Sequence, residues 1–202
     1  TCVRFVGESR HMVETRSAMA PLGMSAPQFS LQDTQGNVVS LRDFEGAPAL
    51  LVMFLCNHCP FVKSLQLDLV GLVQEYQEMG LVAVAINSND FTEYPADNPE
   101  RMAEEVNKAG YTFPYLIDED QSVAKEYRAT CTPDFFLFDD KRELFYRGQF
   151  DDSRPGNNVI ITGIDLRRAI KLALQGEKFC GRQKPSVGCN IKWKSGNQPD
   201  YF

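Results

Sequence analysis

The feature that most constrains this chain is an apolar run that ends in two cysteines spaced three residues apart. Leu50–Leu55 is continuously apolar, Cys56 and Cys59 follow it, and a long amphipathic pattern begins at Pro60. This order predicts a buried strand that delivers a dithiol to the start of a helix. The first N–H groups of a helix are unpaired and carry positive partial charge, so that position favours a thiolate over a thiol. A protonated His58, between the two cysteines, favours the thiolate in the same way.

A Cys-x-x-Cys pair also occurs as half of a zinc site, or as two small packed side chains. Zinc needs two further ligands at short spacing, and the sequence has no second Cys-x-x-Cys and no His-x-x-x-His. A strand, this motif and then a helix are typical of a redox dithiol. We therefore expect neither a metal nor a cofactor. The alternative, a redox-sensing or metal-binding module, would take its ligands from Cys56, His58, Cys59 and Cys131.

Charge and hydropathy narrow the class of partner and the compartment. The net charge is −6 without a basic stripe, which makes nucleic acid a poor partner. No apolar run reaches the length of a membrane span, and the first residues lack a secretory pattern. We interpret Thr1–His11 as an extension before Met12, with Cys2 incidental, and expect a cytoplasmic protein. Cysteines there are more often reactive or buried thiols than a disulfide scaffold.

The first half of the chain predicts a hairpin followed by a strand, a helix and a second strand. The connection from this helix to the second strand is short, which favours parallel strands joined by a right-handed crossover. Pro60 suits the first helical position and Gly80 the stop. The expected elements are strands Phe29–Gln32 and Val38–Leu41, strand Ala49–Leu55, helix Pro60–Met79 and strand Leu81–Asn87.

The second half predicts two more helices, a hairpin and a last helix before a polar tail. Asn98 caps the first of these helices, and a capping box from Thr162 to Asp165 opens the last. We interpret Asp118–Asp120 as a solvated helix start. The expected elements are helix Pro99–Ala109, strand Phe113–Ile117, helix Asp118–Arg128, hairpin Asp134–Phe138 with Leu144–Gln149, and a helix that ends at Gly176. The domain assignment is residues 1–20 as an extension, 21–178 as the domain and 179–202 as a tail packed on it.

This order of elements, with Thr132-Pro133 opening the hairpin, resembles the thioredoxin fold and its peroxiredoxin-like branch. The resemblance implies an α/β fold, with a central mixed sheet flanked by helices, an N-terminal β-hairpin and a C-terminal extension. In that fold a cis-proline faces the dithiol, and Pro133 stands at its position. The dithiol is then presented near solvent at a polar helix tip.

The chain is similar to a bacterial peroxiredoxin-like, AhpC/TSA-related family, whose members are described as thiol–disulfide isomerases or thioredoxins. The similarity runs from about Pro21 to the end. It rests on segments Phe54–Lys63 with its Cys-Asn-His-Cys motif, Ile86–Asp90, Tyr94–Pro95, Cys131–Asp134, Tyr146–Gly156 and Gly188–Lys194. The resemblance implies catalytic roles for Cys56, Cys59 and His58, together with Thr132 and Pro133.

The alignment with thioredoxin indicates which cysteine attacks. In thioredoxin the attacking cysteine is the fifth residue after a phenylalanine of the preceding strand. Counted without gaps from Phe54, that position is Cys59, which also takes the place of the peroxidatic cysteine of peroxiredoxins. Cys56 then stands where peroxiredoxins carry a threonine that helps bind peroxide, and Met53 where thioredoxin buries a proton-accepting aspartate. Pro60 at the first helical position makes Cys59 the N-cap. The rival register keeps Cys56 as attacker with Cys59 one turn into the helix.

Three further cysteines have open roles. Cys131 is two residues before Pro133 and either resolves a mixed disulfide or packs as a small side chain. Cys189 in the matched tail motif is a second candidate for the resolving thiol, because the tail can cross the active-site face. Cys180 is interpreted as an inert free thiol. The stretch Asp151–Arg154 either binds a ligand or seats the tail.

The leading hypothesis is a thiol–disulfide oxidoreductase that acts through a mixed disulfide on protein or small-molecule disulfides. Its reductant would be a thiol such as thioredoxin or glutathione. The alternative is a thiol peroxidase, an antioxidant enzyme that forms a sulfenic acid at Cys59. Either protein would work away from membranes and nucleic acid, as a monomer or a homodimer.

Overall fold

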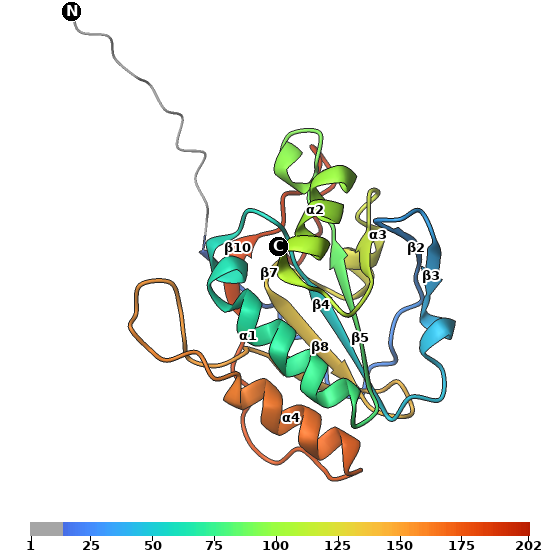
Figure 1. Ribbon diagram of the computed structural model, residues 1–202, viewed down its shortest axis with the longest axis vertical. Helices are drawn as coiled ribbons and strands as arrows, with labels where there is room; N and C mark the ends of the chain where they lie inside the picture. Colours follow the sequence, from blue (N-terminus) through green and yellow to red (C-terminus); the bar gives the residue numbers. More distant parts are fainter. Residues whose placement is uncertain (1–13) are drawn as a thin grey trace, which may run out of the picture.

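The computed structural model describes residues 14–202, whose main element is a mixed sheet with helices on both faces (Figure 1). The interpretations of Thr1–His11, Cys2 and Met12 lie outside the described residues. The helices are α1 (Pro60–Gln77), α2 (Pro99–Ala109), α3 (Ser122–Glu126) and α4 (Ile164–Leu174), with 3₁₀ turns at Leu41–Phe44 and Pro95–Asp97. The strands are β1 (Glu14–Arg16), β2 (Ser30–Asp33), β3 (Val38–Ser40), β4 (Ala49–Phe54), β5 (Leu81–Asn87), β6 (Tyr115–Ile117), β7 (Cys131–Thr132), β8 (Asp134–Phe138), β9 (Leu144–Gly148) and β10 (Val187–Asn190).

The main sheet has the strand order β3-β2-β6-β5-β4-β8-β9 and is mixed. Strand β4 pairs in parallel with β5 and antiparallel with β8, so the strand that precedes the cysteines lies inside the sheet. Every residue of β4 is buried, which explains its unbroken apolar sequence. The predicted hairpins, the parallel pairing of the strands before and after α1 and the fold class are confirmed.

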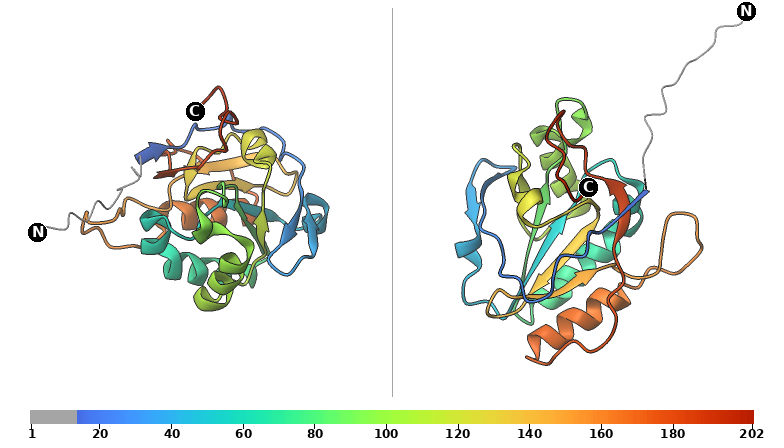
Figure 2. Two further views of the ribbon diagram at one scale, coloured as in Figure 1. Left: turned by 90° about the horizontal axis from the view of Figure 1, so that it is seen from above. Right: turned by 180° about the vertical axis from the view of Figure 1, so that it is seen from behind.

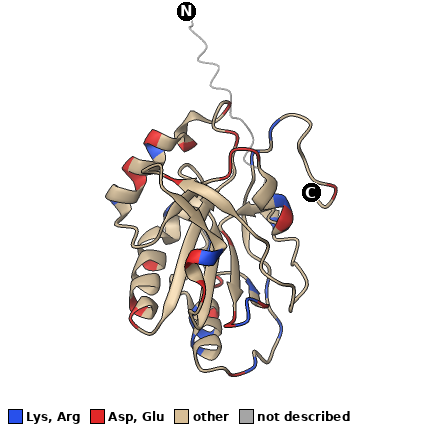
Figure 3. Cartoon of the chain, turned by 90° about the vertical axis from the view of Figure 1, so that its right-hand side faces the viewer, with Lys and Arg blue, Asp and Glu red and all other residues tan. Residues whose placement is uncertain are grey.

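Successive β4 residues contribute to two separate cores, one on each face of the sheet. Leu51 and Met53 pack under α1, α2 and α4, whereas Leu50 and Val52 pack toward α3 and the tail. Figure 2 shows these layers from above, and Figure 3 shows charged residues interspersed over helices and loops but sparse on the central strands. None of the helices within residues 14–202 has the length and apolar character needed to cross a membrane.

Two sequence-based interpretations of helix starts are wrong. Helix α4 has no Thr162–Asp165 capping box: Gly163 is the N-cap, and the N–H groups of Thr162 and Gly163 donate to the carboxylate of Asp151 at 2.6 Å. A carboxylate from another loop therefore replaces the local cap.

The second correction concerns Asp118, which is fully buried rather than solvated. Its carboxylate accepts a hydrogen bond from Ser88 and others from the N–H groups of Val123 and Ala124. Because Gln121 adopts a left-handed conformation (φ 64°), α3 begins only at Ser122 and is shorter than predicted.

The tail, residues 179–202, returns across the domain and completes a second small sheet. This sheet has the order β1-β10-β7, with Cys189 opposite Thr132 and Asn190 opposite Cys131. Ile191 is almost fully buried in the second core. The tail is thus part of the folded structure, and we call β1 and β10 together the strap.

Candidate active site

The two motif cysteines lie between the end of β4 and the start of α1, opposite a cis-proline. Cys59 is the N-cap of α1 with Pro60 in the first turn, as the ungapped register predicts. The Thr132–Pro133 peptide bond is cis. The sulfur of Cys56 lies 3.2 Å from the Thr132 hydroxyl, and the sulfur of Cys59 lies 3.0 Å from the Thr132 carbonyl oxygen, to which its protonated form donates. Thr132 therefore contacts both sulfurs from the strand that faces them.

The dithiol is covered, which corrects the expectation of sulfurs presented near solvent. Cys56 is 2% exposed and Cys59 is 0% exposed. Strand β10 pairs with β7 directly beside them, and a Cβ on Gly188 would lie only 2.0 Å from the Thr132 carbonyl oxygen. The close approach needs glycine here, because any side chain would push the strap off.

A third thiol joins the pair, because β10 brings Cys189 to Cys59. Hydrogen bonds from Cys189 and Cys56, together with the N–H of Val62, lower the pKa of Cys59. Burial raises the pKa of Cys56. The hydrogen bond to Cys59, reinforced by burial, raises the pKa of Cys189. The site therefore holds one favoured thiolate between two thiols.

His58 contacts a buried carboxylate that the sequence reading missed. Its Nδ1 lies 2.7 Å from a carboxylate oxygen of Asp97, and its ring stacks on Tyr94 with 5.7 Å between centroids. Burial of Asp97 would raise its pKa, but His58, Asn89 and the Asn57 N–H hold it below its usual value. No local pattern marks Asp97, which ends a stretch that reads as a polar loop.

The same groups form the one set of potential metal ligands found within residues 14–202. Ligand atoms of Cys56, His58 and Asp97 all lie within 4.8 Å of one another. One sulfur, one nitrogen and one oxygen suit a borderline metal such as zinc. This set differs from the predicted one, because Asp97 takes the place of Cys59 and Cys131.

Cys131 and Cys180 occupy unlike positions. Cys131 is fully buried beneath the site; burial raises its pKa, and its sulfur lies 3.7 Å from the Pro133 carbonyl oxygen. This environment suits a packed thiol more than a resolving one. Cys180 is an exposed free thiol in the tail.

Asp134 follows the cis-proline and is fully buried under the strap. Among residues 14–202 its Oδ1 has no hydrogen-bond partner, and burial raises its pKa to about 7. Its field raises the pKa of the neighbouring Cys131. A buried carboxyl group therefore titrates near neutral pH close to the thiols.

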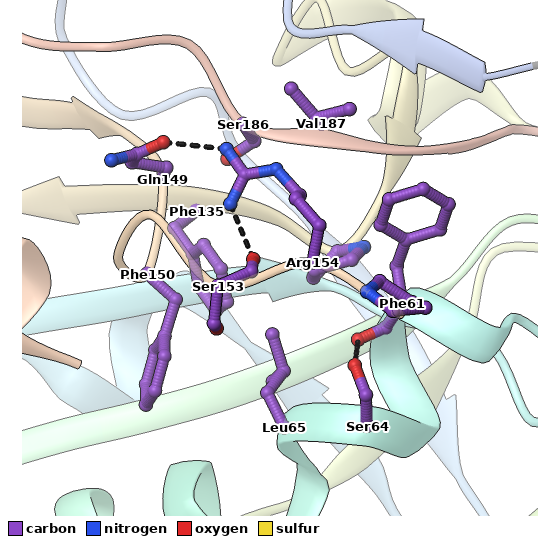
Figure 4. Close-up of a pocket in the computed structure, with 12 residues that line it drawn as sticks. Phe61, Ser64, Leu65, Phe135, Gln149, Phe150, Ser153, Arg154, Ser186 and Val187 are labelled. Atoms are coloured by element: carbon purple, nitrogen blue, oxygen red, sulfur yellow. Dashed lines mark hydrogen bonds between the residues drawn. The ribbon is translucent and has the colours of Figure 1, made fainter. Parts of the chain in front are cut away.

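A narrow cleft opens beside Pro133, between the first turns of α1, the loop after β9 and the strap (Figure 4). Its cavity is small, about 10 Å³, which is about the room of one water molecule. Phe61 lines one side, Val187 of the strap another, and Arg154 projects between Gln149 and Ser153. The cleft adjoins the covered sulfurs through Pro133.

Comparison with known proteins agrees with this geometry. A sequence model of the AhpC/TSA family matches residues 22–147. The thiol-disulfide oxidoreductase ResA of Halalkalibacterium halodurans is 28% identical over 127 residues, which are 63% of this chain and 68% of that protein.

Solved structures extend the likeness to the tail. A hypothetical protein of Sinorhizobium meliloti 1021 superposes with a TM-score of 0.89 at 50% identity, over 90% of this chain and 100% of that one. The thioredoxin domain of a thiol-disulfide oxidoreductase from Bacteroides vulgatus has a TM-score of 0.57 at 18% identity, over 74% of this chain and 98% of that one. At 18% identity, the likeness to the Bacteroides vulgatus domain shows a shared fold and nothing more.

Proposed function

The chain belongs to the AhpC/TSA family, and from this premise we propose that it is a thiol–disulfide oxidoreductase whose attacking group is Cys59. The observation that carries the proposal is a helix-capping cysteine held between two thiol donors beside a cis-proline. A nucleophilic thiol is useful when it is ionised at working pH, and the lowered pKa of Cys59 provides this. The substrate class is protein or small-molecule disulfides.

The reaction consists of two exchanges. In the first, the Cys59 thiolate attacks one sulfur of the substrate disulfide, a mixed disulfide forms, and the other substrate sulfur leaves as a thiolate that takes up a proton. In the second, Cys56 loses its proton and attacks the Cys59 sulfur, and the second substrate thiolate leaves. The protein then carries a Cys56–Cys59 disulfide, which a thiol reductant such as thioredoxin or glutathione reduces.

His58 is the proposed proton acceptor for Cys56. A ring nitrogen of His58 lies within 4.8 Å of the Cys56 sulfur, and Asp97 contacts Nδ1 at 2.7 Å and so holds the ring. Because burial raises the pKa of Cys56, the second exchange needs such a base. Asp97 acts through His58 and is a positioning residue.

Cys189 is a proposed alternative to Cys56 as resolving thiol. It contacts Cys59 directly, and its attack would release the same second thiolate while linking the strap to α1. Mass spectrometry of the oxidised protein separates the two outcomes, since the disulfide is either Cys56–Cys59 or Cys59–Cys189.

The test is reduction of a model disulfide coupled to dithiothreitol. We expect Cys59→Ser to be inactive and Cys56→Ser, with Cys189 also replaced by serine, to accumulate a mixed disulfide at Cys59. Equal activity in the wild type and both variants would remove the proposal. A mixed disulfide at Cys56 in Cys59→Ser would assign the attack to Cys56 instead.

Peroxidase activity is the second candidate, favoured by family membership and the lowered pKa of Cys59. The Cys59 thiolate would attack one peroxide oxygen and become a sulfenic acid, the other oxygen would leave as water, and Cys56 would condense with the sulfenic acid to a disulfide and a second water. Treatment of the double variant Cys56→Ser, Cys189→Ser, which lacks both candidate resolving thiols, with one equivalent of hydrogen peroxide, followed by a sulfenate trap, tests this. Absence of trapped product would exclude it.

A further inference from the structure

The cleft beside Pro133 has the position of a substrate site. Thr132, the residue before Pro133, contacts both reacting sulfurs, and Phe61 is two residues beyond Cys59. A group at the mouth of the cleft therefore lies against Pro133, the neighbour of the residue that contacts both sulfurs. The cavity at its base is only about 10 Å³, about the room of one water molecule, so the cleft does not enclose a ligand and a substrate group would lie across its mouth, against Arg154.

Arg154 supplies the charge in this cleft, and its protein partners are neutral. The guanidinium donates through Nη1 to the carbonyl oxygens of Asp151 and Ser153 and through Nη2 to Gln149. Within residues 14–202 no carboxylate forms an ion pair with it. These three bonds leave two of the five guanidinium donors, including Nε–H, without a protein acceptor among the described residues.

The surrounding contacts fix this guanidinium in place. The side-chain nitrogen of Gln149 donates to carboxylate oxygens of Asp152 at 2.7 Å and Asp165 at 2.6 Å. These bonds orient the amide so that its oxygen faces Arg154. Asp152 in turn pairs with Lys184. Arg154 is half-buried, so its charge is less screened than that of an exposed side chain. A fixed, half-buried guanidinium with free donors is a ready partner for an anion.

We propose that Arg154 binds a carboxylate of the substrate, and that the preferred substrates are small-molecule disulfides that carry a carboxylate close to the reacting sulfur. This inference rests on the proposed function and adds its substrate class. The carboxylate accepts hydrogen bonds from the two free Arg154 donors at the mouth of the cleft, which orients the disulfide past Pro133 toward Cys59. The strap must move from the sulfurs for the exchange itself, and Val187 connects that movement to the cleft.

The experiment compares disulfides of similar size and different charge. The reduced protein is mixed with dithiodipropionate, which is anionic, hydroxyethyl disulfide, which is neutral, or cystamine, which is cationic. The second-order rate of protein oxidation is followed by quenching and mass spectrometry. We expect the wild type to prefer the anionic disulfide over the neutral one by about ten- to a hundred-fold, the range of a charge-assisted hydrogen bond.

Variants locate the preference. We expect Arg154→Gln to lose it while retaining the rate with hydroxyethyl disulfide and gaining rate with cystamine, and Arg154→Lys to keep part of it. Arg101→Gln is the matched control, because Arg101 is an exposed residue of α2 with a surface ion pair to Glu104. This control should keep the full preference.

The outcomes separate the two proposals. If the wild type reacts with none of the disulfides, the proposed function is wrong. If it reacts with anionic and neutral disulfides at equal rates, the oxidoreductase stands and the carboxylate site is wrong. If Arg154→Gln slows all three disulfides equally, Arg154 has only a structural role and the carboxylate site is again wrong.

Discussion

Replacing Gly188 by alanine should uncover the dithiol. The added Cβ would lie 2.0 Å from the Thr132 carbonyl oxygen and 2.5 Å from its carbonyl carbon. Real Cβ contacts are essentially never below 3.0 Å, so the strap has to retreat by about 1 Å or detach. Both neighbours are backbone atoms, which cannot turn away as a flexible side chain does.

The expected magnitude follows from the cost of overpacking, about 1–3 kcal/mol. If this cost falls on the closed strap alone, the fraction of molecules with the strap open rises roughly 5- to 150-fold. The rates at which Cys56, Cys59 and Cys189 react with a thiol reagent in the native protein should rise by the same factor. The free energy of unfolding should fall by no more than the same 1–3 kcal/mol.

The assay is the reaction of the native reduced protein with Ellman's reagent, with Cys2 and Cys180 replaced by serine so that they do not contribute. Gly71→Ala is the matched control: Gly71 is inside α1 with nothing within 4 Å of the added carbon, so it should stabilise the fold by about 0.5–1 kcal/mol without faster thiol reaction. Unchanged thiol reactivity in Gly188→Ala would refute the argument that β10 covers the sulfurs.

Three further predictions concern the titrating groups. Cys189→Ala should raise the pKa of Cys59, because it removes the strongest hydrogen bond to that sulfur, and Cys189→Ser should restore it; pH-dependent alkylation read by mass spectrometry measures both. Burial raises the pKa of Asp134 to about 7, so the folded state keeps a proton that the unfolded chain releases near pH 4. The free energy of unfolding should therefore decrease as the pH rises from about 4 to 7. Asp134→Asn should remove up to about 4 kcal/mol of this decrease, as measured by urea unfolding with dithiothreitol present. Identical pH profiles for the wild type and Asp134→Asn would contradict this. His58→Ala should prolong the mixed disulfide in the chain with both motif cysteines, and quenched-flow mass spectrometry showing an unchanged lifetime would exclude His58 as the base.

Local patterns in the sequence were enough for most of the fold. The apolar run of β4, the Pro60 start of α1 and the Asn98 cap of α2 each depend on neighbours a few residues away, and the structure has them as predicted. The N-cap position of Cys59 follows from Pro60 in the same way. The predicted compartment and oligomeric state remain predictions.

The errors share a physical cause, since each depends on a contact between distant segments. Asp151 caps α4 from another loop, and Asp97 reaches His58 from beyond β5. Strand β10 covers Cys59, and the sequence pattern of β10 does not indicate which part of the chain this strand will pack against. Such contacts are set by tertiary packing, which local propensity does not encode.

The pairing of β10 with β7 also has a consequence for a chain that is still being made. Cys56 and Cys59 leave the ribosome long before Val187–Asn190 exist, and at ordinary rates of translation the delay is on the order of ten seconds. During that interval the reactive sulfurs of a nascent chain are not covered by β10. Newborn molecules, rather than mature ones, should therefore be the population most prone to mispairing with other thiols in the cell.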